Sequence, residues 1–190
     1  MVNIGYCYFI GKGVFRSKRQ AFNWFKKATD LNNSENLYWL SICYRDGKGV
    51  EKNLEESIRL LKIAVELGNA GAMNDLGHFY SRGVGVEKVG AEAIRYYQMA
   101  TDGGSSTGMK NLGVIYEKGI GVEQSYEMAF EFLKNSAELN SKVGIQQLIS
   151  CFKNGVVHGC DESTVIYWEQ KKKELERSEP LDQLRRMGLL

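Results

Sequence analysis

The sequence predicts an all-α repeat protein, and the first observation behind this prediction is a turn motif that recurs at a constant interval. A G-x-G-V turn begins at residues 11, 47, 83 and 119, and a degraded copy begins at 155, where Val157 replaces the second glycine. Each turn begins 36 residues after the previous one, without an insertion or a deletion. A fixed period of this length is typical of helical hairpins that stack along the chain.

The second observation is a set of apolar residues that keeps the same period before each turn. They stand ten, seven and three positions before the first turn glycine, and these spacings of three and four place them on one face of a helix. We call this predicted helix of each repeat helix A. Its apolar residues are Ile4 and Tyr8; Leu37, Leu40 and Tyr44; Met73, Leu76 and Tyr80; Met109, Leu112 and Tyr116; and Ile145, Leu148 and Phe152.

A second helix, helix B, is predicted after each turn. A capping residue stands six positions after the first turn glycine in four repeats, as Ser17, Asn53, Ser125 and Asp161. Gln20 and Glu56 follow their caps by three positions, which is the spacing of a capping box. The third repeat holds Val89 and Gly90 instead, so we expect its helix B to begin less firmly.

The composition favours the same fold and excludes several classes of protein. The 190 residues include a single proline, which favours helices over a turn-rich β protein. The formal charge of +2 predicts no commitment to nucleic acid or to an anionic membrane. No stretch approaches eighteen uninterrupted apolar residues, and residues 1–6 lack the basic start of a signal peptide, so we expect no membrane span and no secretion signal.

The four cysteines point to packed thiols. Cys7, Cys43 and Cys151 stand four positions before their turns, where the other repeats hold Phe79 and Ile115. A position that alternates between cysteine, phenylalanine and isoleucine is a packing position, so we expect inert thiols and a reducing, cytoplasmic setting. A pairing of Cys151 with Cys160 stays open as a weaker alternative.

These repeats resemble a known family. Residues 72–86 (AMNDLGHFYSRGVGV), 108–122 (GMKNLGVIYEKGIGV) and 21–28 (AFNWFKKA) are similar to the Sel-one-like repeat (SLR), a branch of the tetratricopeptide-like α-solenoids. The resemblance covers roughly residues 1–170 and implies a right-handed α/α superhelical solenoid of about five 36-residue helix-turn-helix repeats. It also implies an adaptor that binds other proteins and no conserved chemistry. Some secreted members carry a disulfide in each repeat, and residues such as Thr29, Val65, Leu37 and Met73 occupy those sites here.

The two ends of the array differ in character. We expect the repeats to occupy residues 1–177 and a short C-terminal capping helix to occupy 178–190, with Leu181, Leu184 and Met187 facing the stack. Aromatic residues crowd the other end, including Tyr6, Phe22 and Trp24. Some of these should lie uncovered, which predicts either self-association through the N-terminal edge or a preceding repeat.

No pattern in the sequence indicates catalysis. There are two histidines, His78 and His158, and no cysteine and histidine cluster has the spacing of metal ligands. The segment Gly83–Val86 is not a dinucleotide fingerprint, because it follows a helix and lacks the third glycine. We therefore predict a protein that is not an enzyme and holds no metal or cofactor.

The predicted binding site is the concave groove that helix A would line if the stack is built like its superfamily. Positions nine, five and two before each turn vary in size and charge from repeat to repeat, which packing does not demand. An extended or helical peptide could use such a groove, and ordinary solvated surface residues are the alternative. The predicted groove residues are Tyr38, Ile42 and Arg45; Asn74, His78 and Ser81; Lys110, Val114 and Glu117; and Gln146, Ser150 and Lys153.

Tyr38, Trp39 and Arg45 form the strongest candidate cluster, because aromatic residues and arginine dominate the energetics of interfaces. Trp39 has the alternative of packing between repeats, and His78 could make binding sensitive to pH.

Three functions compete. The first is an adaptor that binds a protein or peptide on the concave face, and the second is a structural or oligomerising segment of a larger protein. The third, a helical-repeat reader of nucleic acid, is disfavoured because the groove mixes Arg45, Lys110 and Lys153 with Glu117 and repeats no base-reading pair.

Overall fold

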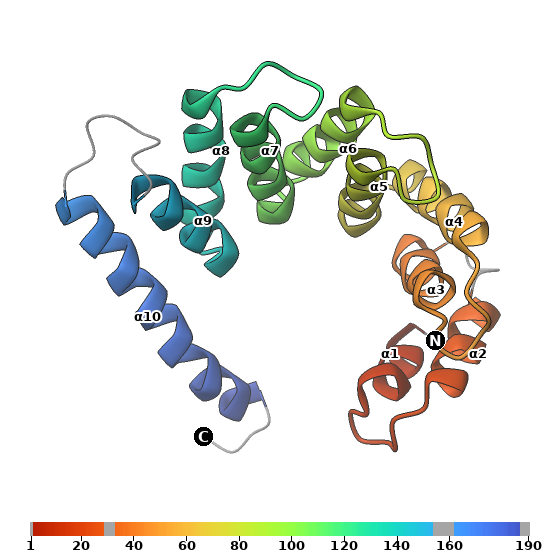
Figure 1. The fold of residues 1–190 in the computed structure, drawn as a ribbon. Coiled ribbons are helices and arrows are strands. Elements are labelled where there is room, and N and C mark those ends of the chain that lie inside the picture. The colour runs from red at the N-terminus through yellow and green to blue at the C-terminus, as the bar shows by residue number, and fades with distance from the viewer. Residues whose placement is uncertain (1, 29–32, 154–161, 187–190) are drawn as a thin grey trace. The chain divides into compact units, whose positions relative to one another are not determined.

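The computed structural model describes residues 2–28, 33–153 and 162–186, with side chains placed for 4–28, 33–153 and 163–178. Within these ranges the chain is all-α, with ten helices and no strand (Figure 1). The helices are α1 (Val2–Ile10), α2 (Lys18–Ala28), α3 (Ser34–Asp46), α4 (Leu54–Glu66), α5 (Ala70–Arg82), α6 (Gly90–Asp102), α7 (Ser106–Lys118), α8 (Tyr126–Glu138), α9 (Lys142–Lys153) and α10 (Glu162–Arg186). The prediction of two helices per repeat is confirmed.

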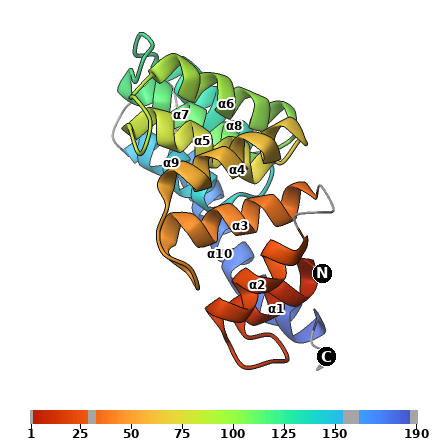
Figure 2. The same cartoon turned by 90° about the vertical axis from the view of Figure 1, so that its right-hand side faces the viewer.

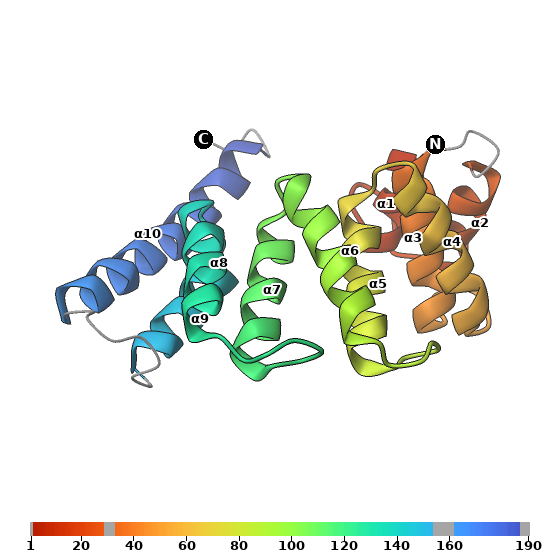
Figure 3. The ribbon, with the colours of Figure 1, turned by 90° about the horizontal axis from the view of Figure 1, so that it is seen from above.

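The chain forms two compact units, residues 1–99 and residues 100–190. In the first unit, α1 packs against α2, and α3 packs against α4 (Figure 2). In the second unit, α7, α8 and α9 lie side by side and α10 packs on α9 (Figure 3).

The first glycine of the turn ends helix A in the four repeats whose turns the structure describes. Gly47 adopts a φ of 68°, a left-handed conformation that favours glycine, and its amide donates a hydrogen bond to the Cys43 carbonyl. Two further bonds close the turn, from the Lys48 amide to the Cys43 carbonyl and from the Asn53 amide to the Tyr44 carbonyl, both 2.9 Å. Equivalent pairs of bonds close the turns that begin at 11, 83 and 119, so these four turns share one backbone design.

The caps of helix B are confirmed where the structure describes them. The Asn53 side chain accepts a hydrogen bond from the Glu56 amide at 2.9 Å, and Ser17 and Ser125 cap α2 and α8 in the same manner. The reciprocal half of the predicted capping box does not form at Glu56, because its carboxylate accepts two hydrogen bonds from Arg59 instead. The predicted cap at Asp161 lies outside the described residues.

The two helices of each hairpin touch through a small residue on helix A. A β-carbon built on Gly5, Gly77 or Gly113 would lie 2.6 Å from the side chain of helix B opposite, which is Phe25, Tyr97 or Leu133, respectively. All three partners are buried, with at most 3% of their surface exposed. The glycine therefore allows a large side chain to fill the space between the helices.

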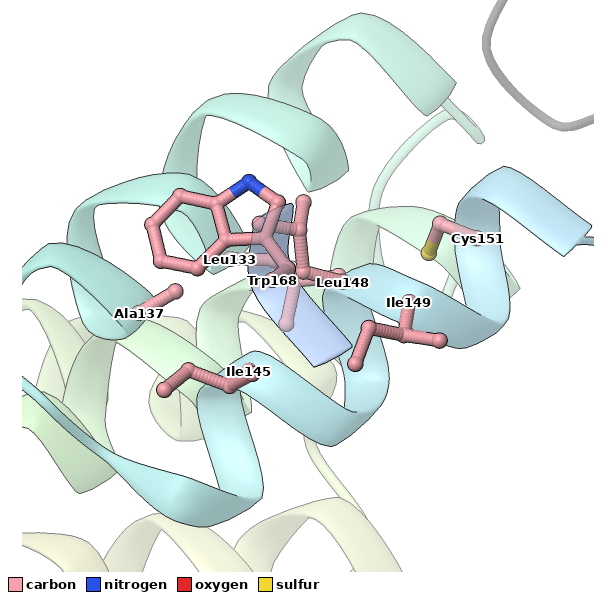
Figure 4. Packing of buried hydrophobic residues seen from close by; sticks show 7 residues of the cluster. All are labelled: Leu133, Ala137, Ile145, Leu148, Ile149, Cys151 and Trp168. Carbon is pink, nitrogen blue, oxygen red and sulfur yellow. The ribbon is translucent and has the colours of Figure 1, made fainter. Parts of the chain in front are cut away.

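The leucines of the predicted core face of helix A are buried, with Leu37, Leu40, Leu76, Leu112 and Leu148 each at most 5% exposed. Ile4 at the same repeat position in α1 is 43% exposed, which differs from the prediction, and the aromatic residues three positions before each turn are partly buried. In the second unit the core gathers Leu133, Ala137, Ile145, Leu148, Ile149, Cys151 and Trp168 (Figure 4). Trp168 belongs to α10, so α10 packs against this core through its side chain.

The C-terminal boundary differs from the prediction. We expected a separate capping helix over residues 178–190, but α10 runs from Glu162 to Arg186 without a break. Ser178 donates its hydroxyl to the Leu175 carbonyl, as a residue within a helix does. The side chains of Leu181, Leu184 and Met187 lie outside the described residues, so their predicted contacts stay predictions.

Candidate functional site

An ion pair joins the A helices of two neighbouring repeats in the first unit. The guanidinium of Arg45 on α3 donates to the Asp75 carboxylate on α5 at 2.6 Å, and its Nε donates to the Asp46 carboxylate at 2.7 Å. Lys48 completes the group with a 2.5 Å bond to Asp46. All four side chains are partly buried, so the pairs are better shielded from water than exposed surface pairs.

The two aspartates respond to this arginine in opposite ways. The hydrogen bond from Arg45 lowers the pKa of Asp46 to about 2, because it favours the charged carboxylate. Burial raises the pKa of Asp75, although Arg45 acts against that effect. Both aspartates accept hydrogen bonds from Arg45, and these bonds orient its guanidinium.

Tyr38 lies beside this ion pair and against the next repeat. A β-carbon built on Gly71 of α5 would lie 2.9 Å from the tip of the Tyr38 ring, so the absence of a side chain at Gly71 makes room for the tyrosine. Burial, followed by the charge of Asp75, raises the pKa of Tyr38 to about 12. The phenol therefore keeps its proton and remains able to donate a hydrogen bond.

Trp39 packs into the first unit instead of facing a groove, as the alternative prediction proposed. Its ring lies 5.1 Å from Tyr6, 5.3 Å from Phe9 and 6.2 Å from Phe25, measured between ring centroids. Its indole nitrogen donates to the Glu35 carboxylate at 2.7 Å. Trp39 is thus a packing residue that supports its neighbour Tyr38.

Two other predicted groove residues of the first unit are buried. Ile42 is 6% exposed and Asn74 is 8% exposed, so neither side chain offers much surface to a partner. His78 is exposed, and Ser81 is partly exposed and donates its hydroxyl to the His78 carbonyl at 2.9 Å. The surface that remains on α3 and α5 is formed by Tyr38, Arg45, Asp75, His78 and Ser81, and we call it the α3–α5 surface.

In the second unit, α10 occupies part of the predicted groove. Lys172 donates to Gln146 at 2.6 Å, and Lys153 pairs with Glu169 at 2.6 Å. These contacts border a cleft between α9 and α10. Lys110, Val114, Glu117 and Ser150 are each partly exposed.

The close pairing of the earlier hairpins is lost between α9 and α10. Ile149 stands at the helix A position that is glycine or serine in the other repeats, and Glu169 replaces the large apolar partner. The contact between a small residue and a large apolar side chain that joins the earlier hairpins therefore has no counterpart at these two positions.

Asp75 was not predicted as a groove residue. It stands eight positions before its turn, where the other repeats hold Asn3, Trp39, Asn111 and Gln147, and this position was not among the three expected to face a groove. Opposite charge was the signal in the sequence that could have revealed this pair. Arg45 stands two positions before one turn, and Asp75 stands eight positions before the next turn.

The described residues contain no group of three or more histidine, cysteine or acidic side chains that could hold a metal ion. Among those same residues, no helix is both long and apolar enough to cross a membrane. Cys43 and Cys151 are buried free thiols, and burial raises the pKa of each to about 11, which disfavours the reactive thiolate. Cys160 and His158 lie outside the described residues.

The repeats match a known family along most of their length. The Sel1 repeat family matches residues 1–33, 37–69, 70–105 and 106–141. The chain is a Sel1 repeat protein. The resemblance seen in the sequence motifs is thereby confirmed for four copies, and the matched copies end before α9 and α10.

Solved structures of other Sel1 repeat proteins share the fold. A Sel1 repeat protein from Oxalobacter formigenes is 30% identical, with a TM-score of 0.85 over 91% of this chain and 71% of its own. A protective antigen of uropathogenic Escherichia coli strains, described as displaying an SLR fold, is 26% identical with a TM-score of 0.79. That match covers 91% of this chain and 37% of the antigen.

Cysteine rich protein B of Helicobacter pylori shares the fold at 24% identity, with a TM-score of 0.55 over 70% of this chain and 96% of its own. A search of curated proteins finds no match. The family and the fold of this Sel1 repeat protein are therefore shown, whereas its partner has to be inferred from its surface.

Proposed function

We propose that this Sel1 repeat protein is a non-catalytic adaptor that binds a protein or peptide on its A-helix face, and that the α3–α5 surface is the part of this face that carries the affinity. The observation behind the proposal is the fixed arrangement of Tyr38 and Arg45 beside Asp75. Arginine and tyrosine are the residue types that contribute most at interfaces, and rigid side chains lose little entropy on binding.

Packing alone does not require these residues. The residue equivalent to Arg45 is Ser81 in the next repeat and Glu117 in the repeat after that, although all three repeats form the same hairpin. The position of Tyr38 likewise holds Asn74 and Lys110. These surface positions vary from repeat to repeat, whereas the apolar core positions of helix A keep the same character. Such a difference is consistent with selection for a partner.

The surface chemistry favours a protein over a nucleic acid. Arg45 already contacts two carboxylates, and the neighbouring Asp75 and Asp46 would repel a phosphate backbone. Buried free thiols at Cys43 and Cys151 fit a reducing compartment, so we place the protein in the cytoplasm.

Replacing Tyr38 and Arg45 together with alanine should weaken partner binding by about tenfold or more, because two central side chains of the contact would be lost. The purified chain serves as bait, its partners are identified by mass spectrometry, and the affinity of a recovered partner is then titrated. The matched control is Glu55→Ala with Lys62→Ala, two exposed residues on helix B of the same repeat. Circular dichroism verifies that both double variants remain folded. Equal affinity of the two variants for the partner would contradict the assignment of the site.

Self-association through the N-terminal edge is a second candidate function, favoured by the exposure of α1. Ile4 is 43% exposed, whereas Leu40 and Leu76 at the same repeat position are 4% and 0% exposed. Tyr6 on the same helix is 38% exposed. Uncovered apolar surface of this kind marks interaction sites.

If α1 mediates self-association, the purified chain should sediment as a dimer or larger species at high concentration. Substituting Ile4→Lys and Tyr6→Lys should return it to a monomer, because the charges cannot be buried without partners. Analytical ultracentrifugation over a range of concentrations measures this. A wild-type chain that stays monomeric throughout would argue against the second function and leave the adaptor proposal intact.

A further inference from the structure

The turn between α1 and α2 has the backbone of the other turns but a different surface. Hydrogen bonds from the Lys12 amide to the Cys7 carbonyl and from the Ser17 amide to the Tyr8 carbonyl close it in the shared way. Residues 13–16 project from the end of the hairpin between these two bonds (Figure 1). At their tip Phe15 is 97% exposed, and Ile10, which enters the turn, is 45% exposed.

The other repeats carry charged residues at these two positions. The equivalents of Ile10 are Asp46, Arg82 and Lys118, and the equivalents of Phe15 are Glu51, Glu87 and Glu123. The backbone of the turn therefore does not require apolar side chains. Phe15 also follows Val14, which is 38% exposed, so this turn presents several apolar side chains to water, and apolar surface that is gathered in one place marks an interaction site.

Stacking against a preceding repeat would not cover Phe15 or Ile10. In the second repeat, the turn glycine Gly49 lies against the backbone of Lys18, which belongs to helix B of the repeat before it. Glu51 in that same turn nevertheless remains exposed, and the Asp46 side chain keeps 28% of its surface exposed while it pairs with Arg45 and Lys48. The position of Phe15 is thus outside the surface that one repeat offers to the next, whether or not a repeat precedes α1.

The third repeat shows the same arrangement. A β-carbon built on Gly85 would lie 2.9 Å from Ile58 of the preceding helix B. Arg82 and Glu87 beside it are exposed. Two stacked turns therefore agree that these positions face water in an assembled array.

Positive charge surrounds the exposed turn. Residues 1–28 hold six of the 25 lysines and arginines and none of the 23 acidic residues, so they carry +6 while the rest of the chain carries −4. Lys12, Arg16 and Arg19 are exposed, and none of them forms an ion pair within the described part of the chain. Lys18 is held locally, since it donates to the Phe9 carbonyl at 2.6 Å and lies over the Phe9 ring.

We propose that the α1–α2 turn binds an anionic lipid surface. Phe15 and Ile10 would enter the interface between headgroups and acyl chains, and Lys12, Arg16 and Arg19 would face the lipid phosphates and carboxylates. Buried apolar area and electrostatic attraction to anionic lipids both add to the affinity of a protein surface for a membrane, and this turn offers both. The total charge of +2 predicted no attachment to a membrane. That total hides an uneven distribution, because residues 1–28 carry +6 and the remaining residues carry −4.

The shape of the turn favours a lipid surface over an acidic protein. Phe15 protrudes with almost all of its surface in water, so no neighbouring wall could enclose a side chain of a partner. A stable protein interface needs shape-matched contacts over roughly 800 Å² on each partner. A bilayer accepts a protruding ring without any matching shape, and its charge need not match a particular arrangement of cations.

The test is co-sedimentation of the full chain with phosphatidylcholine vesicles that contain or lack phosphatidylserine. We expect binding to the vesicles with phosphatidylserine and a loss of binding as salt is raised, because screening weakens the attraction. Phe15→Glu should lower the partition coefficient by about tenfold or more, since it removes the anchor and adds a repelled charge. The double variant Arg16→Gln with Arg19→Gln should also lower the partition coefficient, although it leaves Phe15 in place.

The control variants come from the other turns. Glutamate already stands at the equivalent positions 51, 87 and 123, so Phe15→Glu should leave the circular dichroism spectrum and thermal midpoint unchanged. Glu51→Gln, in the second turn, should leave vesicle binding unchanged. A folded wild-type chain that ignores phosphatidylserine overturns the proposal and makes an acidic protein the occupant of the turn. Equal binding by wild type and Phe15→Glu overturns it as well.

Discussion

Replacing Gly49 with alanine should lower the free energy of unfolding by about 3 kcal/mol, from two separate effects. Gly49 adopts a φ of 84°, and a β-carbon in this left-handed region costs about 1–2 kcal/mol. The added carbon would also press into the backbone carbonyl of Lys18, which cannot swing away as a side chain can. Urea unfolding followed by circular dichroism measures the change.

Gly13 supplies the matched control. It stands at the same position of the first turn with a φ of 71°, and a β-carbon built there meets nothing within 4 Å. Gly13→Ala should therefore cost only the conformational part, about 1–2 kcal/mol. If both variants lose the same stability, then contact between neighbouring repeats at Gly49 does not contribute, and the repeat interface is looser than the structure shows.

Replacing Gly77 with serine should destabilise the chain by about 2 kcal/mol through overpacking within a hairpin. A β-carbon at Gly77 would lie 2.6 Å and 2.7 Å from two ring atoms of Tyr97, and this ring is 3% exposed and has no free space to enter. The higher helix propensity of serine offsets only part of this cost. Thermal and urea unfolding provide the measurement.

The second repeat predicts how to rescue this variant. Its equivalent residues are Ser41 and Leu61, both buried at 1% exposed or less, so that hairpin accommodates a serine opposite a leucine. Gly77→Ser combined with Tyr97→Leu should recover most of the lost stability, and the double-mutant cycle should show a coupling of at least about 1 kcal/mol. Additive effects of the two substitutions would show that the helices do not pack through this pair.

The constant 36-residue period predicted more than the fold class. It located the turns at 11, 47, 83 and 119, the cap at Asn53 and the buried leucines at 40, 76, 112 and 148, and the structure bears out these features. Such features depend on residues close together in the chain, where helical spacing and the conformational freedom of glycine determine the local structure. The tight pairs at Gly77 and Gly113 follow the same period, but their partners twenty residues away became visible only in the packed hairpin.

The candidate surface was predictable only in part. Tyr38, Arg45 and His78 were predicted on one face of helix A from helical geometry, and all three keep contact with water. Ile42 and Asn74 were expected on that face too, and the structure buries both. A spacing rule cannot predict how closely the neighbouring helix approaches, and this approach decides which residues at the edge of a face keep contact with water.

The sequence alone determined the hairpins, their order and their turns, since each of these depends on interactions within one 36-residue unit. The tertiary structure alone decided that Arg45 reaches Asp75, that Trp39 packs among aromatic rings, and that α10 contacts Gln146 and Lys153. These contacts join residues that are tens of positions apart or lie on an atypical terminal helix. Their formation depends on how whole helices pack. This packing balances apolar burial against charge pairing between repeats, and a pattern within one repeat cannot predict that balance.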